Sequence, residues 1–228
     1  MTDRRVPRGR FFITGTDTEV GKTWVACRLL EQASAAGLRT LGLKPVAAGA
    51  DPAPSPCGTH DGPTNEDARA LMAASSIKLP YDQVNPVLLQ APMAPHLAAQ
   101  QEGRRMNVAR LAGYVRGALL SEAARDPDLL LVEGAGGWKV PVNDRESLAD
   151  LAVELDLPVI LVVGMRLGCL NHALLTADAI RACGLRLAAW VANVLPGQTM
   201  AALDDNIATL EQWLPAPRLS LPPVVGHY

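Results

Sequence analysis

The residues best suited to chemistry lie near the N-terminus, where an apolar run meets a glycine-bounded loop. Gly15 and Gly21 bound this loop, and Gly-Lys-Thr at 21–23 opens an expected helix. In such a loop the backbone N–H groups and the positive end of the helix face an anion, Lys22 adds a full charge, and the Thr23 hydroxyl can hold Mg²⁺. The pattern therefore predicts a binding site for the phosphates of a nucleotide.

The loop is a variant, because the ordinary pattern has four residues between its first glycine and the Gly-Lys pair. Here five residues separate Gly15 from Gly21, and Thr16 stands at the usual first-glycine position. A glycine-rich turn with an exposed lysine is the alternative, but strand, loop and helix follow in the order that the motif requires. The loop residues expected to bind the nucleotide are Gly15, Thr16, Asp17, Glu19, Val20, Gly21, Lys22 and Thr23.

Two further charged residues directly follow apolar runs. Lys44 precedes Pro45, and its cation would face a phosphate or a substrate carbonyl. Glu133 follows four aliphatic residues and precedes Gly-Ala-Gly-Gly, so its carboxylate would be desolvated unless it meets Mg²⁺ or a cation. Asp67 opens a helix after a long loop. It is either a carboxylate favoured by the helix dipole or a second Mg²⁺ ligand, and spacing alone does not separate the two.

Three weaker candidates also follow strands or lie in the loop. The expected helix start at 168–171 offers unpaired amides that can bind a carboxylate. Asn193 could read a base edge through its amide, and for both features a capping or turn role is an equal alternative. Glu19 would repel phosphate from inside the loop, so we expect it to point toward a second substrate bearing an amine, with Thr18 beside it.

These residues need a scaffold that brings strand ends together. Apolar strands are expected at 11–14, 38–45, 129–132, 158–164 and 186–194, and helices at about 21–36, from 64, from 107, and at 147–155, 170–182 and 199–213. This alternation predicts a single-domain α/β fold of the P-loop NTPase type, a mostly parallel sheet with helices on both faces. In such sheets ligands bind beyond the carboxyl ends of the strands. Segments 47–64 and 77–96 are expected to be irregular.

Chain length, net charge and cysteine spacing indicate which broad class of protein this is. The 228 residues suit one α/β domain over 1–228, with 1–9 expected to be a flexible N-terminus. A net charge of −2 argues against partners such as nucleic acid or an anionic membrane. The four cysteines have no paired metal-ligand spacing, and no signal peptide or membrane-length apolar run is evident. We therefore expect a cytoplasmic protein.

Five blocks of the sequence together resemble the dethiobiotin synthetase family. They occur in the family's order, and the resemblance covers about residues 10 to 217. A phosphate loop alone would be a weak signal, whereas the five blocks in combination are highly specific. The blocks are Gly15–Thr23, Lys44–Gly49, Val132–Trp138, Leu167–His172 and Trp190–Asn193.

The resemblance implies an ATP- and Mg²⁺-dependent cyclo-ligase that acts as a homodimer. It would convert 7,8-diaminopelargonic acid and CO₂ to dethiobiotin, ADP and phosphate through a carbamate and a carbamic-phosphoric anhydride. By matching position, Lys22, Lys44, Thr18 and Glu19 would be catalytic, Asn193 and Pro223 would contact the nucleotide, and Thr23, Asp67 and Glu133 would surround Mg²⁺. The implied substrate-binding residues are Thr18, Lys44, Ala48, Gly168, Cys169, Leu170 and Asn171.

The chain departs from the family at Ala48, where the family has a serine, and at Asn206, which aligns roughly with a tyrosine in some members.

Three alternative functions can each be tested against the sequence. A partitioning or regulatory P-loop ATPase usually carries an additional lysine early in the loop, where this chain has Thr-Asp-Thr-Glu at 16–19. An amidotransferase-type ligase needs a further glutamine-hydrolysing domain. A nucleotide-binding subunit with degraded chemistry would not need Lys22 and Glu133 intact.

Overall fold

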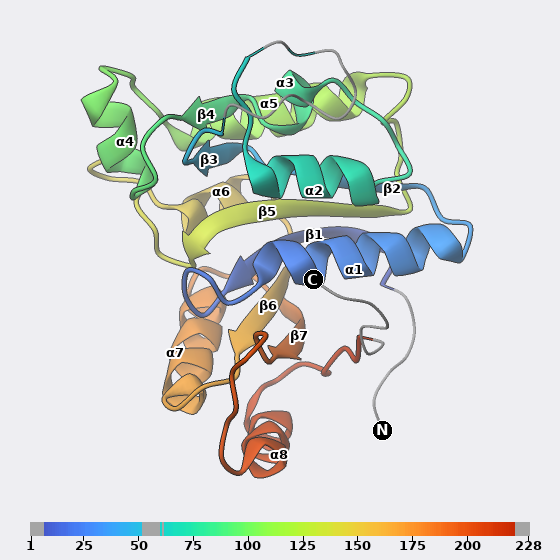
Figure 1. The fold of residues 1–228 in the computed structure, drawn as a ribbon, viewed down its shortest axis with the longest axis vertical. Coiled ribbons are helices and arrows are strands. Elements are labelled where there is room, and N and C mark those ends of the chain that lie inside the picture. Colours follow the sequence, from blue (N-terminus) through green and yellow to red (C-terminus); the bar gives the residue numbers. More distant parts are fainter. Residues whose placement is uncertain (1–6, 52–59, 61, 222–228) are drawn as a thin grey trace.

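A parallel sheet built around β1 (Gly9–Gly15) forms the centre of the molecule. In the computed structural model, which describes residues 7–51, 60 and 62–221, this sheet has five strands. Their spatial order is β2-β5-β1-β6-β7 (Figure 1). All of them are largely buried, which is why they read as near-continuous aliphatic runs. The other four strands are β2 (Thr40–Leu43), β5 (Leu129–Gly137), β6 (Val159–Gly164) and β7 (Leu187–Asn193).

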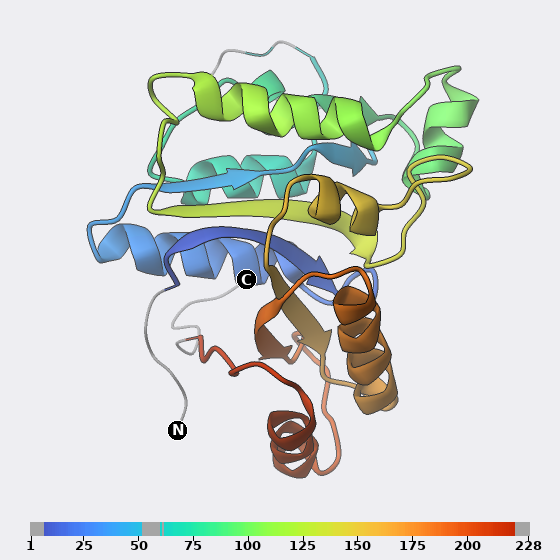
Figure 2. The same cartoon turned by 180° about the vertical axis from the view of Figure 1, so that it is seen from behind.

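Helices cover both faces of this sheet, as the sequence predicts. Successive side chains of β1 point to opposite faces, so that Ile13 and Phe12 belong to different hydrophobic clusters. The cluster of Ile13 includes Val25 and Leu29 of α1 (Lys22–Ala35). The cluster of Phe12 on the opposite face includes residues of further helices, drawn in light green, gold and orange in Figure 2. They are α5 (Val108–Leu120), α6 (Leu148–Glu154) and α7 (Cys169–Ala182), and α8 (Leu203–Trp213) packs against α7.

The prediction that 47–64 and 77–96 are irregular is wrong for several stretches. β3 (Val46–Ala48) and β4 (Val87–Leu89) form a second, two-stranded parallel sheet. Segment 77–96 also contains α3 (Tyr81–Val84) and the start of α4 (Pro95–Gln101). Two of the prolines that suggested irregular structure, Pro80 and Pro95, occupy helix starts, where the missing N–H is not needed. Residues 52–59 and 61 lie outside the described residues.

The longer elements agree with their predicted positions. Asn65 caps α2 (Glu66–Ala74) and Asn107 caps α5, each accepting a backbone N–H with its side chain. α8 begins at Leu203 rather than near 199. Gly9 already belongs to β1, so the expected flexible N-terminus does not extend to it, and residues 1–6 lie outside the described range. No helix in the described ranges is long and apolar enough to cross a bilayer.

Candidate functional site

A cavity of about 630 Å³ opens at the carboxyl ends of β1 and β5, beside the start of α1. The edge predicted from the strand-end residues therefore contains a binding space, formed mainly by the loop before α1, the end of β3 and the glycine segment of β5. Seventeen residues line it: Thr18, Glu19, Gly21, Lys22, Thr23, Lys44, Ala47, Ala48, Asn65, Asp67, Pro92, Met93, Ala94, Pro95, Ala135, Gly136 and Val140.

The loop owes its shape to two residues in left-handed conformation. Gly21 has φ +82° and Glu19 has φ +55°, a value that few non-glycine residues adopt. Between them the buried Val20 side chain fills space left by two glycines. A Cβ on Gly15 would lie 2.5 Å from Val20 Cγ2, and a Cβ on Gly164 would lie 2.8 Å from Val20 Cγ1. Both glycines are thus needed for the loop to pack onto the sheet.

A cluster of opposite charges forms the floor of the cavity. The Nζ atom of Lys44 lies 2.6 Å from Glu133 Oε1 and 2.9 Å from Asp67 Oδ2. The Thr23 hydroxyl donates to the same Glu133 oxygen over 2.7 Å. Glu133 is 0% exposed and Lys44 3%. Residues predicted from separate strand and helix ends therefore meet at one point.

Burial and charge shift the pKa values in this cluster. Burial, reinforced by the neighbouring Lys44 cation, lowers the pKa of Lys22 to about 8. Burial also disfavours the charge on Lys44, but the Glu133 and Asp67 carboxylates outweigh it and raise the pKa of Lys44. For Asp67, burial is likewise outweighed by the Lys44 cation and its hydrogen bond, and the pKa falls below the ordinary value. The mutual attraction of Lys44 and Asp67 therefore favours the charged form of each.

The oxygen atoms of this cluster suit Mg²⁺. Glu133 Oε2 is buried and has no hydrogen-bond partner among the described residues. A buried carboxylate oxygen without a donor is unfavourable, and a cation or its bound water would satisfy it. Thr23 and Asp67 supply further oxygen ligands nearby, as a magnesium site partly completed by phosphates requires. The predicted set of Thr23, Asp67 and Glu133 therefore fits the ion.

Other loop residues take different positions around the cavity. Thr18 and Glu19 are exposed and line it, as does Ala48 from β3. Asp17 points elsewhere: its carboxylate accepts from the Thr18 N–H and pairs with Arg166. The backbone oxygen of Asp17 accepts from Lys22 Nζ over 3.1 Å. The substrate-side roles of Thr18 and Glu19 remain predictions.

Several predicted residues do not line the cavity of the single chain. The stretch Gly168–Asn171 lies at the start of α7, with Cys169 only 1% exposed. Asn193 lies at the end of β7 and donates its Nδ2 to Val20 O over 2.8 Å. Pro223 falls outside the described residues. Neither the carboxylate role of the α7 start nor the base contact of Asn193 is tested by these positions.

The lining contains residues that the sequence did not indicate. Pro92, Met93, Ala94 and Pro95 form one wall, and Asn65 contributes from the cap of α2. The apolar residues carry no chemical signal, and the proline-rich segment suggested only a lack of regular structure. Asn65 was recognised as a helix start, but its place beside the cavity depends on hydrogen bonds from Asn65 to Gly49 O and to the Tyr81 hydroxyl, which the sequence alone does not reveal.

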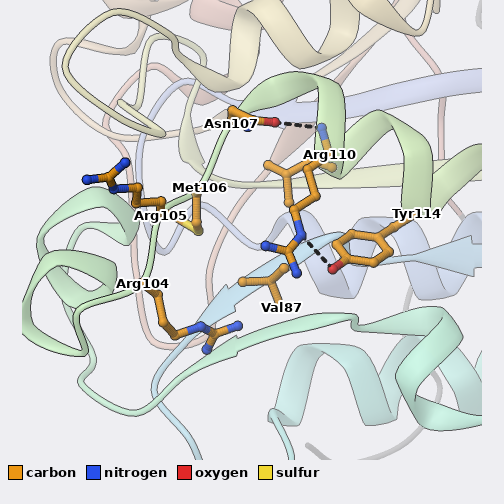
Figure 3. Close-up of a pocket in the computed structure, with 8 residues that line it drawn as sticks. Val87, Arg104, Arg105, Met106, Asn107, Arg110 and Tyr114 are labelled. Atoms are coloured by element: carbon orange, nitrogen blue, oxygen red, sulfur yellow. Dashed lines mark hydrogen bonds between the residues drawn. The ribbon is translucent and has the colours of Figure 1, made fainter.

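A second cavity, of about 240 Å³, lies between β4 and the start of α5 and contains none of the predicted site residues (Figure 3). Arg104, Arg105 and Arg110 surround it. Arg104 donates to Leu88 O and to Glu102, and Arg110 donates to the Tyr114 hydroxyl. Two of its three arginines are thus already engaged within the protein.

Comparison with known proteins identifies relatives across most of the chain. A family model described as an AAA domain matches residues 9–225. A protein from Cellvibrio japonicus named ATP-dependent dethiobiotin synthetase BioD is 56% identical over 93% of this chain and 88% of its own length. Proteins of the same name from Marinobacter nauticus and Pseudomonas aeruginosa are 51% and 53% identical, again over 93% of this chain and over 87% and 89% of their own lengths.

Solved structures give the fold alone. FtsY from Elizabethkingia anophelis aligns with a TM-score of 0.55 at 15% identity, over 96% of this chain. Chloroplast FtsY from Physcomitrella patens aligns with a TM-score of 0.53 at 17% identity, over 98% of it. The chain spans only 61% and 63% of those two proteins, respectively. The likeness supports the predicted P-loop α/β architecture and carries nothing about activity.

Proposed function

Since this chain belongs to the family of ATP-dependent dethiobiotin synthetases and is therefore an ATP-dependent ligase of biotin biosynthesis, we propose that it converts 7,8-diaminopelargonic acid and CO₂ to dethiobiotin. ATP would be the co-substrate, and ADP and phosphate the other products. Two observations carry the proposal. Lys22, Thr23, Lys44 and Asp67 all line one cavity beside the phosphate loop. The buried Glu133 contacts two of them, Thr23 and Lys44.

The reaction would proceed in three steps. One amine of the substrate attacks CO₂ and loses a proton, giving a carbamate. A carbamate oxygen then attacks the γ-phosphorus of ATP, and the bond to ADP breaks, leaving a carbamic-phosphoric anhydride. Finally the second amine attacks the carbamate carbon, phosphate leaves and the ureido ring closes. Both amines belong to one bound molecule, so enforced proximity replaces a covalent enzyme intermediate.

The residues supply charge and position rather than a nucleophile. Phosphoryl transfer depends mainly on electrostatic stabilisation and alignment. Lys22 and Lys44 would neutralise charge on the transferring phosphoryl group, and the amides at the start of α1 would hold the phosphates. Thr23, Asp67 and Glu133 would hold Mg²⁺, which when bound would offset the charge of the triphosphate.

The reacting end of the substrate would lie against the exposed part of the loop. Thr18 and Glu19 line the cavity there, and the Glu19 carboxylate is suited to an ammonium group. Ala48 lies in the same cavity and leaves room for a water where the family has a serine hydroxyl. The nucleotide base would reach Asn193.

We further propose that the chain acts as a homodimer. The α7 start at Gly168–Asn171, which the family resemblance assigns to the substrate carboxylate, does not line the cavity of its own chain. Next to it, Leu167 is 97% exposed, and Leu175 on α7 is 61% exposed. If the start of α7 faced the cavity of a second copy, this would explain both its distance from its own cavity and the exposed leucines beside it.

One assay tests the function directly. Phosphate release from ATP and Mg²⁺ is measured with and without 7,8-diaminopelargonic acid and bicarbonate. The ligase requires strong dependence on the diamine, whereas a regulatory ATPase would hydrolyse ATP briskly whether or not the diamine is present. The Lys22→Ala variant should lose turnover while its circular dichroism spectrum stays that of the parent. A near-normal rate in this variant would refute the assignment of the loop.

A further inference from the structure

The side chain of Asn193 reaches from the sheet to the phosphate loop. Its Nδ2 donates to the backbone oxygen of Val20 over 2.8 Å, and the residue is only 6% exposed. Because Val20 O can only accept, the amide nitrogen must face the loop. Asn193 is itself fixed at the end of β7, where its own carbonyl oxygen accepts from the Met165 N–H over 2.8 Å. The loop is therefore tied to a rigid edge of the sheet.

This hydrogen bond sets the direction of one loop amide. Val20 O belongs to the peptide unit that contains the Gly21 N–H, and in a trans peptide the C=O and N–H point in opposite directions. With the carbonyl held by Asn193, the Gly21 N–H must point away from β7. That N–H has no hydrogen-bond partner among the described residues, and Gly21 lines the cavity. It is thus available to an anion bound there.

The packing at Gly21 leaves little freedom for this peptide. Gly21 has φ +82°, and a Cβ added to it would lie 2.2 Å from Asn193 Nδ2. The amide thus lies directly against the glycine as well as bonding to the preceding carbonyl. On the other side of the same peptide, the Val20 side chain is lodged between Gly15 and Gly164. Asn193 and Val20 together hold the peptide in the left-handed loop conformation.

We propose that Asn193 is a positioning residue for the nucleotide's phosphates, which acts by orienting the Gly21 N–H toward them. This role rests on the proposed function, because it requires the loop to bind a triphosphate. It is separate from any contact between Asn193 and the base. Removal of the Asn193 amide should therefore weaken a ligand that has phosphates and no base.

The experiment compares the binding of ATP and of inorganic tripolyphosphate, each with Mg²⁺, by titration calorimetry. For Asn193→Ala we expect the affinity for tripolyphosphate to fall by about tenfold, the effect of one lost hydrogen bond to a charged group. ATP affinity should fall at least as much. Asn193→Asp places an acceptor against Val20 O and should be at least as damaging. The control is Asn107→Ala, which removes the same atoms from the cap of α5 and should leave both affinities unchanged.

A spectroscopic readout separates positioning from general loss of structure. In protein labelled with ¹⁵N-glycine, tripolyphosphate should shift the Gly21 amide proton of the parent downfield, and the shift should shrink in Asn193→Ala while the other glycine signals stay in place. If both Asn193 variants bind tripolyphosphate as the parent does and only their ATP affinity falls, the proposal is overturned. Asn193 would then contact the base of the nucleotide rather than position its phosphates. A parent protein that binds both ligands but releases phosphate without the diamine would refute the ligase and leave the role of Asn193 standing.

Discussion

At the scale of single residues, the Lys44–Glu133 pair links the chemistry of the site to its stability. Both side chains are almost completely buried, and their charged atoms are 2.6 Å apart. Burying two charges costs much of what their attraction supplies, so such a pair adds little net stability. Removing one partner strongly destabilises the protein, because the remaining charge is then buried without compensation.

We expect Lys44→Met to lower the free energy of unfolding by about 3 kcal/mol at neutral pH, because Glu133 then loses its cation. Adding Glu133→Gln to the same chain should restore most of the loss. Urea denaturation of the two single variants and the double variant measures this coupling. Arg116→Met, which breaks the exposed Arg116–Glu154 pair, is the control and should change stability by less than about 1 kcal/mol. An equally small effect of Lys44→Met would contradict the buried-pair interpretation.

The lowered pKa of Lys22 predicts how phosphate binding depends on pH. Burial and the nearby Lys44 bring this pKa to about 8, so the free protein loses the Lys22 charge as pH rises through that value. A bound polyphosphate favours the charged form, so binding above pH 8 must take up a proton, whereas near pH 7 the lysine is already charged. Affinity for ATP should therefore decline above pH 8. Calorimetry in buffers of different ionisation enthalpy detects the uptake, and proton release at that pH would be inconsistent with this view.

The sequence allowed the charged residues to be identified but not how they pair. A carboxylate after four aliphatic residues indicated that Glu133 needs a cation, and that expectation is confirmed. Its partner could not be named, because Lys44 lies 89 residues away and the contact exists only once β2 and β5 pair. For Asn193 the sequence left a base contact and a capping or turn role equally open, and it did not indicate the hydrogen bond to Val20 O that the side chain makes. The direction of a side chain at a strand end depends on its neighbours in the folded protein, and the spacing of residues in the sequence does not specify them.

At the scale of elements, two glycines flank α1 in the same backbone conformation but in different surroundings. Gly21 precedes the helix with φ +82°, and Gly37 follows it with φ +80°. A Cβ on Gly21 would meet Asn193, whereas nothing lies within 4 Å of a Cβ on Gly37. Alanine substitutions at these two glycines therefore separate the effect of backbone strain, present at both, from the effect of a steric clash, present only at Gly21.

Gly37→Ala should lower stability by about 1 kcal/mol through the left-handed conformation alone and leave ATP affinity unchanged. Gly21→Ala carries the same strain and in addition pushes the loop away from Asn193, so we expect ATP affinity to fall by at least about a hundredfold. Thermal unfolding and calorimetry on both variants provide the comparison. Equal ATP affinities in the two variants would show that the loop geometry at Gly21 is not needed for binding.

Long elements were predictable and short ones were not. α1, α5, α7 and the buried strands have enough residues for periodicity, caps and aliphatic runs to agree with one another. β3 and β4 have three residues each, and their pairing joins Val46 to Val87, 41 residues apart in the chain. Such short strands are defined by their partner rather than by their own pattern, so the wall of the cavity that they support could not be derived from sequence.

At the scale of the whole molecule, the proposed dimer gives a sharp test. Leu167 and Leu175 expose apolar surface near the start of α7, and a second copy would cover it. We expect the parent to sediment as a dimer and the double variant Leu167→Asp, Leu175→Asp to sediment as a monomer with reduced ligase activity. Leu120→Asp, at a position that is 79% exposed on α5, is the matched control and should remain dimeric. A monomeric parent would exclude the dimer.

The order of strands in the sheet also determines when the chain can fold during synthesis. β1 and β2 precede β5 in the chain but do not pair with each other, because β5 lies between them and pairs with both. The 113 residues between Gly15 and Leu129 therefore emerge from the ribosome before the strand that joins these two. At roughly 5–20 residues per second, about 6 to 23 s pass between the synthesis of β1 and the start of β5, and the central sheet cannot begin to assemble before then.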